Sequence, residues 1–377
     1  MANVSFLLSA KALGMSFDPT PPTELQFEAS GTPNCLIRLR QWDRDNGERG
    51  LEVQCSAAFE VSEWERDFIA AQLERRYLAS ATMPLKLPYR INGETHIEAD
   101  GSMREGFGIP FEFLPPEIQA LCGRAREHLT ATLSRFIKLL RWEQASPGAH
   151  ALFEYSPSLY WALGREDYHK HVKAPREDFE TSALGGVKWG AEHEERMALL
   201  WRSEGVEEPL AHELLREACY LANGGSPRSA LLIAVSAVET GLKNHISRHV
   251  KSSGWLVECA QSPPVYKILR DYIPDLHVES NPEMKWSGIR HLSKKLQTYV
   301  ELRNQLIQYG KANFDNKDAF ALVDLVSDIL YVLDFLSGHV WAQSNVSSAL
   351  ARELGWSVAE GKGIRINVLS GYPLPND

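Results

Sequence analysis

Hydrophobic positions follow one periodicity in the first part of the chain and another in the second. In the first part, apolar residues alternate with polar ones over short stretches, which predicts strands with one buried face. The clearest run is Leu51, Val53, Cys55, Ala57 and Phe59. From about residue 207 onward, apolar residues recur at steps of three and four, which predicts amphipathic helices. Strands in one part and helices in the other indicate an α+β protein.

Residues 1–145 are predicted to form an α+β domain with a small, mostly antiparallel sheet. Residues 34–60 have the alternation of a hairpin. Asn92-Gly93, flanked by two apolar stretches, predicts a second hairpin with a two-residue turn. Residues 103–113 are predicted to add a further strand. We expect this domain to fold separately from the rest and to contain no catalytic site.

Two helices are predicted within the same domain. Ser62 followed by Glu65 is a capping-box pattern, and it predicts a helix that continues to about Ala79. Pro115-Pro116 begin a second helix that runs to about Trp142, because apolar residues recur along one side of it. These residues are Leu121, Leu129, Leu133, Phe136 and Leu140.

Residues 146–204 hold no period for long, and their aromatic residues lie among Pro, Gly and charged side chains. Two interpretations are open: a second part of the first domain, or a partly ordered connector. We treat the stretch as a connector that limited proteolysis should cut. Its aromatic rings could stack on bases, but packing against a neighbouring domain is the commoner use of such residues.

Helical pattern dominates residues 205–340 and predicts a bundle of four main helices and one short one. The predicted helices are 209–223, 228–250, 263–272, 287–309 and 317–336. The second of these is nearly all apolar in its first half, so it should be the central buried helix. The tail, residues 341–377, carries a predicted short helix at Ser348–Leu354 and a predicted strand at Ile364–Leu369.

The composition is that of an ordinary globular protein: 377 residues, 44% hydrophobic and 24% charged. A net charge of −9 argues against a protein that coats nucleic acid over its whole surface, but it leaves room for a local basic site. Five dispersed cysteines without CxxC spacing indicate reduced thiols. No apolar run reaches the roughly 18–20 residues of a membrane span, and the first residues lack a basic signal-peptide region. We expect a cytoplasmic protein that does not bind membranes.

The candidate site lies at the end of the predicted helix 287–309, in the segment Leu302–Gly310. Arg303 and Asn304 are followed, after three residues, by Gln308. Asn304 and Gln308 are four residues apart, so they share a face of the helix. Arg303 is five residues from Gln308, so the two converge only if the helix end unwinds or a second chain contributes. Gly310 is predicted to end the helix.

An Arg-Asn pair followed after three residues by His, at the end of a helix in an all-helical bundle, is the signature of the HEPN superfamily. Residues 205–340 resemble this superfamily, and most of all the HEPN domains of Apea-type bacterial defence proteins. Arg303 matches the family's Arg and Asn304 its frequent neighbour. The position of the catalytic His is occupied by Gln308.

The resemblance implies a metal-independent endoribonuclease of a bacterial anti-phage (abortive-infection) or toxin system. Its substrate would be RNA, with tRNA as one candidate, and it would need no cofactor. In the family, two copies of the motif pair across a homodimer, so that both chains build one site. The resemblance also implies that Glu239, on the most apolar helix, orients Arg303 through an ion pair. Lys311 would help Arg303 to bind the phosphate. A phage-derived trigger or an antitoxin is the implied regulatory partner.

Gln308 leaves two interpretations open, because an amide cannot accept and return a proton near neutral pH. Either the chain is an inactive His-to-Gln form of the nuclease, which we favour, or it is a HEPN-like module that binds RNA or protein without catalysis. Ordinary alternatives remain for the other residues. Arg303 could simply cap carbonyls at the helix end, and Glu239 could pair with Arg228 or Lys243 instead.

No metal site is predicted. His245 and His249 are four residues apart on one helix, a spacing that can bind metal. No third ligand is evident from the sequence, so we expect these side chains to be exposed at the helix end. Asp167, His169 and His171 lie in an irregular stretch and are interpreted in the same way. Phosphate-binding glycine motifs and a GxSxG motif are absent from the sequence.

Overall fold

The computed structural model forms two compact units, residues 1–139 with 151–206 and residues 140–150 with 207–377. The first unit contains the main β-sheet and the second is helical, so the predicted α+β class is confirmed. The residues that the structure describes are 2–12, 15–18, 25–29, 33–43, 49–78, 86–105, 107–146, 152–153, 156–164, 170–172, 186–188, 190–203, 205–250, 264–310 and 313–356.

The described part of the first unit contains a six-stranded antiparallel sheet with the order β3-β4-β5-β1-β8-β9. Strand β1 is central: Ala2 lies opposite Val61 of β5, and Ser5 lies opposite Ala162 of β8. The six strands are β1 (Ala2–Ala12), β3 (Leu25–Ala29), β4 (Cys35–Asp43), β5 (Arg49–Val61), β8 (Ser158–Ala162) and β9 (Lys170–Val172). Two smaller pairs join β2 (Ser16–Asp18) to β10 (Gly186–Lys188) and β6 (Tyr89–Ile91) to β7 (Glu94–Ile97).

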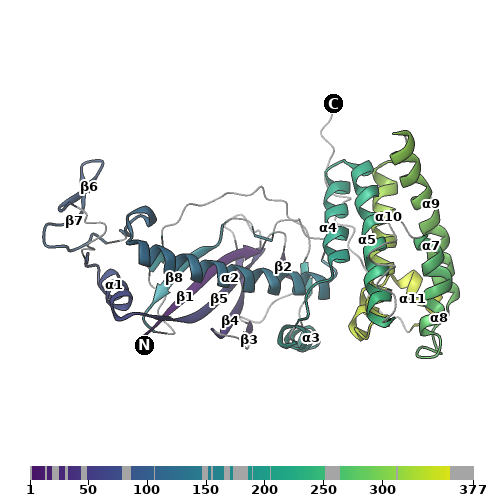
Figure 1. The fold of residues 1–377 in the computed structure, drawn as a ribbon, viewed down its shortest axis with the longest axis horizontal. Coiled ribbons are helices and arrows are strands. Elements are labelled where there is room, and N and C mark those ends of the chain that lie inside the picture. The colour runs from purple at the N-terminus through teal and green to yellow at the C-terminus, as the bar shows by residue number, and fades with distance from the viewer. Residues whose placement is uncertain are drawn as a thin grey trace. The chain divides into compact units, whose positions relative to one another are not determined.

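Helix α2 (Pro116–Glu143) runs along one face of this sheet (Figure 1). The ring of Phe136 packs 5.1 Å from that of Phe27, and the ring of His128 packs 5.9 Å from that of Phe59. The Nε2 atom of His128 also lies 3.4 Å from Sγ of Cys35. Two further helices, α1 (Glu63–Leu73) and α3 (Ala191–Arg202), belong to this unit, together with the short turn η1 (Phe111–Phe113). The sheet and α2 therefore build the core.

The two hairpins and both helices predicted for residues 1–145 are present, with one boundary wrong. The capping box of Ser62 and Glu65 is formed, but α1 ends at Leu73 and not near Ala79. Arg75 adopts a left-handed φ of 58°, and its carbonyl accepts a hydrogen bond from the Met103 amide at 2.8 Å. Pairing with another segment therefore replaces the next helical turn.

The strand predicted for residues 103–113 is wrong. Met103 makes only an isolated bridge to Ile97, and Phe111–Phe113 form a single 3₁₀ turn preceded by Pro110. Proline has no amide hydrogen to donate, so Pro110 would leave a gap in any ladder of hydrogen bonds at this position.

Of the predicted connector, residues 146–204, the part from 151 onward belongs to the first unit instead. Its segment Ser158–Ala162 is β8, which pairs with the central strand β1, and its segment Ala191–Arg202 is α3. Leu159 and Trp161 of β8 are buried. The first of the two interpretations, a second part of the first domain, describes this stretch better.

The second unit is a helical bundle in which α4, α5, α9 and α10 lie side by side (Figure 1). The four main helices agree with the predicted stretches to within a few residues, but the short helix predicted to end at residue 272 continues to His277, and the segment η3 was not predicted. The helical segments of this unit are α4 (Leu210–Asn223), α5 (Pro227–His249), α7 (Val265–Lys267), the π-helical turn η2 (Ile268–Tyr272), α8 (Ile273–His277), α9 (Ser287–Tyr309), α10 (Asn316–Leu336), the 3₁₀ segment η3 (Val340–Asn345) and α11 (Ser348–Leu354). The strand predicted at Ile364–Leu369 lies outside the described residues.

Helix α5 is the central helix of the bundle, as predicted, because it contacts α4, α9 and α10. Ala234, Val235 and Val238 are fully buried on it. Gly241 permits close packing here: a Cβ atom on it would lie 2.5 Å from Cδ2 of Leu330 on α10. Among the helices that the structure describes, none combines the length and the apolar character needed to cross a membrane.

Candidate functional site

The Arg-Asn motif lies on the last two turns of α9. Leu292 and Leu296 are buried and anchor the middle of this helix in the bundle. Toward its end the helix becomes exposed: Ile307 is 62% and Tyr309 is 73% accessible. Gly310, with a φ of 66°, ends α9 in the left-handed conformation, as predicted. The motif is therefore presented at an accessible end of a well-anchored helix.

The predicted ion pair between Glu239 and Arg303 is confirmed. Nη2 of Arg303 on α9 donates a hydrogen bond to Oε1 of Glu239 on α5, and both side chains are partly buried. Nη1 of Arg303 donates to Oδ1 of Asn304 at 3.1 Å. Two acceptors thus hold the guanidinium from two directions, which leaves it less free than a lone surface arginine.

Gln308 is exposed one turn beyond Asn304 on the same helix. Its amide does not ionise near neutral pH, so it supplies hydrogen bonds but no proton transfer. Lys311, the predicted second phosphate ligand, lies outside the described residues. The arrangement can bind and orient an anion such as a phosphate through Arg303. It contains neither a general base nor a general acid at the motif position.

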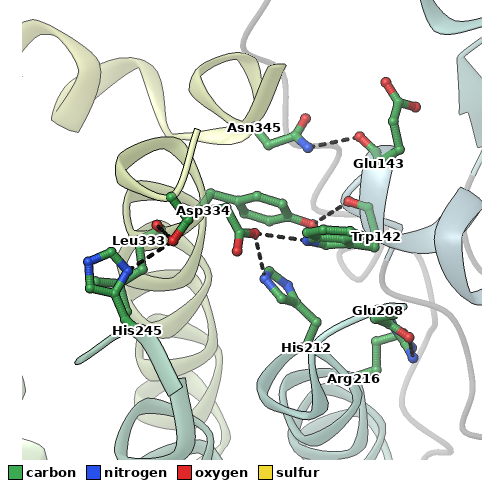
Figure 2. Close-up of polar contacts among 11 residues, drawn as sticks. Trp142, Glu143, Glu208, His212, Arg216, His245, Leu333, Asp334 and Asn345 are labelled. Atoms are coloured by element: carbon green, nitrogen blue, oxygen red, sulfur yellow. Dashed lines mark hydrogen bonds and ion pairs between the residues drawn. The ribbon is translucent and has the colours of Figure 1, made fainter. Parts of the chain in front are cut away.

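A buried polar network elsewhere in the bundle was not predicted from the sequence (Figure 2). Oδ2 of Asp334 on α10 accepts hydrogen bonds from Nε1 of Trp142 and from Nε2 of His212 on α4, each at 2.8 Å. The Tyr331 hydroxyl donates to the Trp142 carbonyl, and the Asn345 amide donates to the Glu143 carbonyl, each at 2.9 Å. These contacts attach the last turn of α2 to α4, α10 and η3.

A second buried group joins Arg216 of α4 to Glu208 through an ion pair (Figure 2). Burial, followed by the positive charge of Arg216, lowers the pKa of the neighbouring Arg141 to about 10. Glu208 and Arg216 are buried, as are Trp142, His212 and Asp334. Because Glu208 pairs with Arg216, and Asp334 accepts from both Trp142 and His212, we assign these buried side chains to the stability of the bundle.

The expectation for the histidines of α5 is half wrong. His249 is exposed at the helix end, as predicted, but His245 is 3% accessible. A third histidine, His277 at the end of α8, lies against them, with its Nε2 atom 2.7 Å from Nε2 of His245. One potential ligand atom of each ring lies within 4.8 Å of those of the other two. The three side chains could hold a metal ion.

The other candidate ligands in the sequence were Asp167, His169 and His171. Asp167 and His169 lie outside the described residues, and His171 lies in β9 opposite Tyr160 of β8, in the first unit. Four of the five cysteines, Cys35, Cys55, Cys122 and Cys219, are buried free thiols, as expected, and Cys259 lies outside the described residues.

Comparisons with protein-family models, with curated proteins and with solved structures found no match to this chain.

Proposed function

We propose that the helical bundle is a HEPN-type endoribonuclease domain of a bacterial defence or toxin system, present here in an inactive form that binds RNA. The observation that carries the proposal is the ion pair between Glu239 and Arg303. The family resemblance implied this pair between residues 64 positions apart, on two different helices. An arginine that only capped its own helix would have no need of a carboxylate on a neighbouring helix.

The geometry supports a role in holding phosphate. Glu239 and Asn304 occupy Nη2 and Nη1 of Arg303, so the side chain is pre-oriented before any ligand binds. Guanidinium groups recognise phosphate oxygens through paired hydrogen bonds. A phosphate at this end of α9 would meet an arginine whose conformational freedom is already reduced, which lowers the entropic cost of binding.

The proposal includes a homodimer that brings two copies of the motif together. One chain offers a single Arg303 and no acid–base group, whereas two chains offer two cations on either side of one RNA phosphate. Ile307 and Tyr309 expose large apolar side chains on the same helix end. Apolar groups gathered next to a charged site are typical of surfaces that bind a partner.

RNA cleavage by transesterification needs a base for the 2′-hydroxyl, an acid for the leaving oxygen and a cation for the phosphorane. Arg303 supplies the cation, and Gln308 supplies neither of the other two. Loss of a general acid–base group lowers a rate by about 10²–10⁴-fold. The chain as it stands is therefore proposed to bind RNA and to cleave it poorly or not at all. The first unit would sense a trigger in the cytoplasm or restrain the site.

The decisive experiment is Gln308→His. Histidine has an ordinary pKa near 6.5 and can act as base and acid at neutral pH. We expect the variant to cleave single-stranded RNA or tRNA to 2′,3′-cyclic phosphate ends in buffer that contains EDTA and no divalent metal. The further change Arg303→Ala should abolish this cleavage. Circular dichroism and light scattering under the same conditions verify that each variant is folded and dimeric.

The alternative is a binding module without a nuclease site, and the presence of Gln308 favours it. It predicts that folded, dimeric Gln308→His remains inert on RNA, also when a trigger-containing lysate from infected cells is added. It further predicts that RNA retention on a filter falls for Arg303→Ala but is unchanged by Gln308→His. Cleavage by the His variant would exclude this alternative.

A further inference from the structure

We propose that His245, His249 and His277 form a binding site for one divalent transition metal ion of the zinc class. The three residues come from the end of α5 and the end of α8, and their ligand atoms converge to within 4.8 Å. The inference does not depend on the proposed function, and it assigns to the bundle a site that lies apart from the Arg-Asn motif on α9.

The second nitrogen of two of the rings is already engaged in the way that metal-binding histidines require. Nδ1 of His249 lies 2.8 Å from the carbonyl oxygen of His245, and a carbonyl only accepts, so this nitrogen carries the hydrogen. Its Nε2 atom is then the bare one. Metal-bound histidines usually donate their other N–H to a carbonyl, a carboxylate or water, which fixes the ring and its tautomer.

His245 is oriented in the same manner by Ser337 of the segment after α10. Nδ1 of His245 lies 3.0 Å from Oγ of Ser337, and that hydroxyl donates its own hydrogen to the Leu333 carbonyl at 2.8 Å (Figure 2). The hydroxyl therefore accepts from Nδ1–H, and the Nε2 atom of His245 is left with a lone pair that points at His277.

His277 completes the site from the opposite side. Its Nε2 atom lies 2.7 Å from Nε2 of His245, which requires that His277 donates a hydrogen bond while no ion is present. Ligand nitrogens around tetrahedral zinc are about 3.3 Å apart, given zinc–nitrogen distances of about 2.0–2.1 Å. The Nε2 atoms of His245 and His277 are closer than this, at 2.7 Å, and the candidate ligand atoms of the three rings all lie within 4.8 Å of one another. Small side-chain rotations therefore suffice to reach the zinc geometry. On binding, the hydrogen of His277 moves from Nε2 to Nδ1, and no net proton is released.

The surroundings of these histidines disfavour their protonated forms and favour neutral rings, which can bind a metal. Burial, followed by the charges of the neighbouring His249 and His277, lowers the pKa of His245 to about 3. Burial, followed by the charge of His249, also lowers the pKa of His277. These two rings are neutral at pH 7 and offer lone pairs. Imidazole ligands favour zinc, copper, nickel or cobalt over magnesium and calcium, which prefer oxygen. The exposed His249 leaves room for a water molecule as the fourth ligand.

The alternative is that the three rings only pack and form one hydrogen bond. The site can be tested with untagged full-length protein stripped with EDTA and titrated with Zn²⁺ or Co²⁺. We expect about one equivalent of metal to remain after dialysis, visible absorption of tetrahedral cobalt, and a higher melting temperature with Zn²⁺. Metal content is measured by mass spectrometry, so the readout does not depend on any enzymatic activity.

His249→Ala and His277→Asn should each lower the metal affinity by at least about 10²-fold. His291→Ala is the matched control, because His291 is an exposed histidine of the same bundle that pairs with Glu353 at 3.0 Å. It should bind metal as the unmodified chain does. Equal metal content in the unmodified chain and in folded His249→Ala would overturn the proposal, as would no cobalt absorption in the unmodified chain. If His277→Asn fails to fold, His249→Ala decides, since that side chain is exposed.

Discussion

Removal of either partner of the Glu239–Arg303 ion pair should destabilise the contact between α5 and α9 by about 1–3 kcal/mol. The side chains of Glu239 and Arg303 are 17% and 14% accessible, so this ion pair lies between a fully exposed and a fully buried one. Exposed pairs contribute about 0.2–1 kcal/mol, and breaking a fully buried pair costs about 3–5 kcal/mol. A hydrogen bond to a charged group contributes about 1.5–3 kcal/mol, and the remaining solvent contact lowers the expected loss.

The two single substitutions should not be equivalent. Glu239→Ala leaves Arg303 with the Asn304 acceptor, 3.1 Å from Nη1. Arg303→Ala removes a cation from a carboxylate that is only 17% accessible. We therefore expect the larger loss for Arg303→Ala, and a double variant that is little worse than this single one. The coupling energy from the cycle should be about 1–2 kcal/mol.

Native-state hydrogen exchange of peptides from α5 and α9 measures this locally, so that unfolding of the other unit does not enter the result. Glu301→Ala is the control, because Glu301 is an exposed residue of α9 that accepts from Gln297 at 2.8 Å. Its effect should stay within about 0.5 kcal/mol. A coupling energy below about 0.5 kcal/mol would show that the pair behaves as a surface contact and not as a partly buried ion pair.

Three further outcomes are expected. Asp334→Ala leaves the Trp142 and His212 donors buried without their acceptor and should cost about 3–5 kcal/mol in urea unfolding; Asp334→Asn should cost less, since one oxygen accepts both bonds. Gly241→Ala should lower the melting temperature despite better helix propensity, because its Cβ would meet Leu330 at 2.5 Å. Burial lowers the pKa of His339 below its ordinary value of 6.5, so the folded state resists protonation of this ring and loses stability as the pH falls below 6.5. His339→Gln should therefore flatten the fall in the urea midpoint between about pH 7 and pH 5.

Local signals in the sequence were sufficient for much of the fold. The capping box of Ser62, the turn at Asn92-Gly93 and the helix Ser348–Leu354 depend on neighbours within a few residues, and the structure contains all three. The central helix of the bundle was equally clear, because its apolar run is too long for a partly exposed helix.

Strands β1 and β8, which pair with each other inside the sheet, were not predicted. Strand β1 is buried on both faces: Val4, Phe6 and Leu8 are inaccessible, and Leu7 between them is 7% accessible. Its apolar residues nevertheless take every second place from Val4 to Ala12, and only Leu7 interrupts the alternation, so the sequence does contain a strand signal here. Strand β8 was missed because its partner β1 lies about 150 residues earlier in the chain, and only that pairing gives the segment its conformation.

The contact of Glu239 with Arg303 was predicted from the sequence, but the contact of His245 with His277 was not. Glu239 lies among apolar residues on α5, and a carboxylate in such a place needs a partner; the family resemblance named Arg303 as that partner. His245 occupies a similar place, but nothing in the sequence marks His277 as its neighbour. His277 follows Pro274 in a short helix that begins with a π-helical turn, and only the folded bundle brings it to α5.

Both sites therefore begin from the same feature of α5, a polar side chain that is at least partly buried. Each of these side chains turns to a group on a different helix: Glu239 to a guanidinium on α9 and His245 to an imidazole on α8. A carboxylate can orient a cation that meets an anionic ligand, and neutral imidazoles can share a metal ion. The wholly buried network around Asp334 differs, because its donors and acceptors already satisfy one another. At each site a side chain of α5 lies next to a residue at an accessible helix end. Glu239 contacts Arg303 near the end of α9, and His245 lies beside His249 at the end of α5 itself. These two helix ends are where ligand binding is best sought.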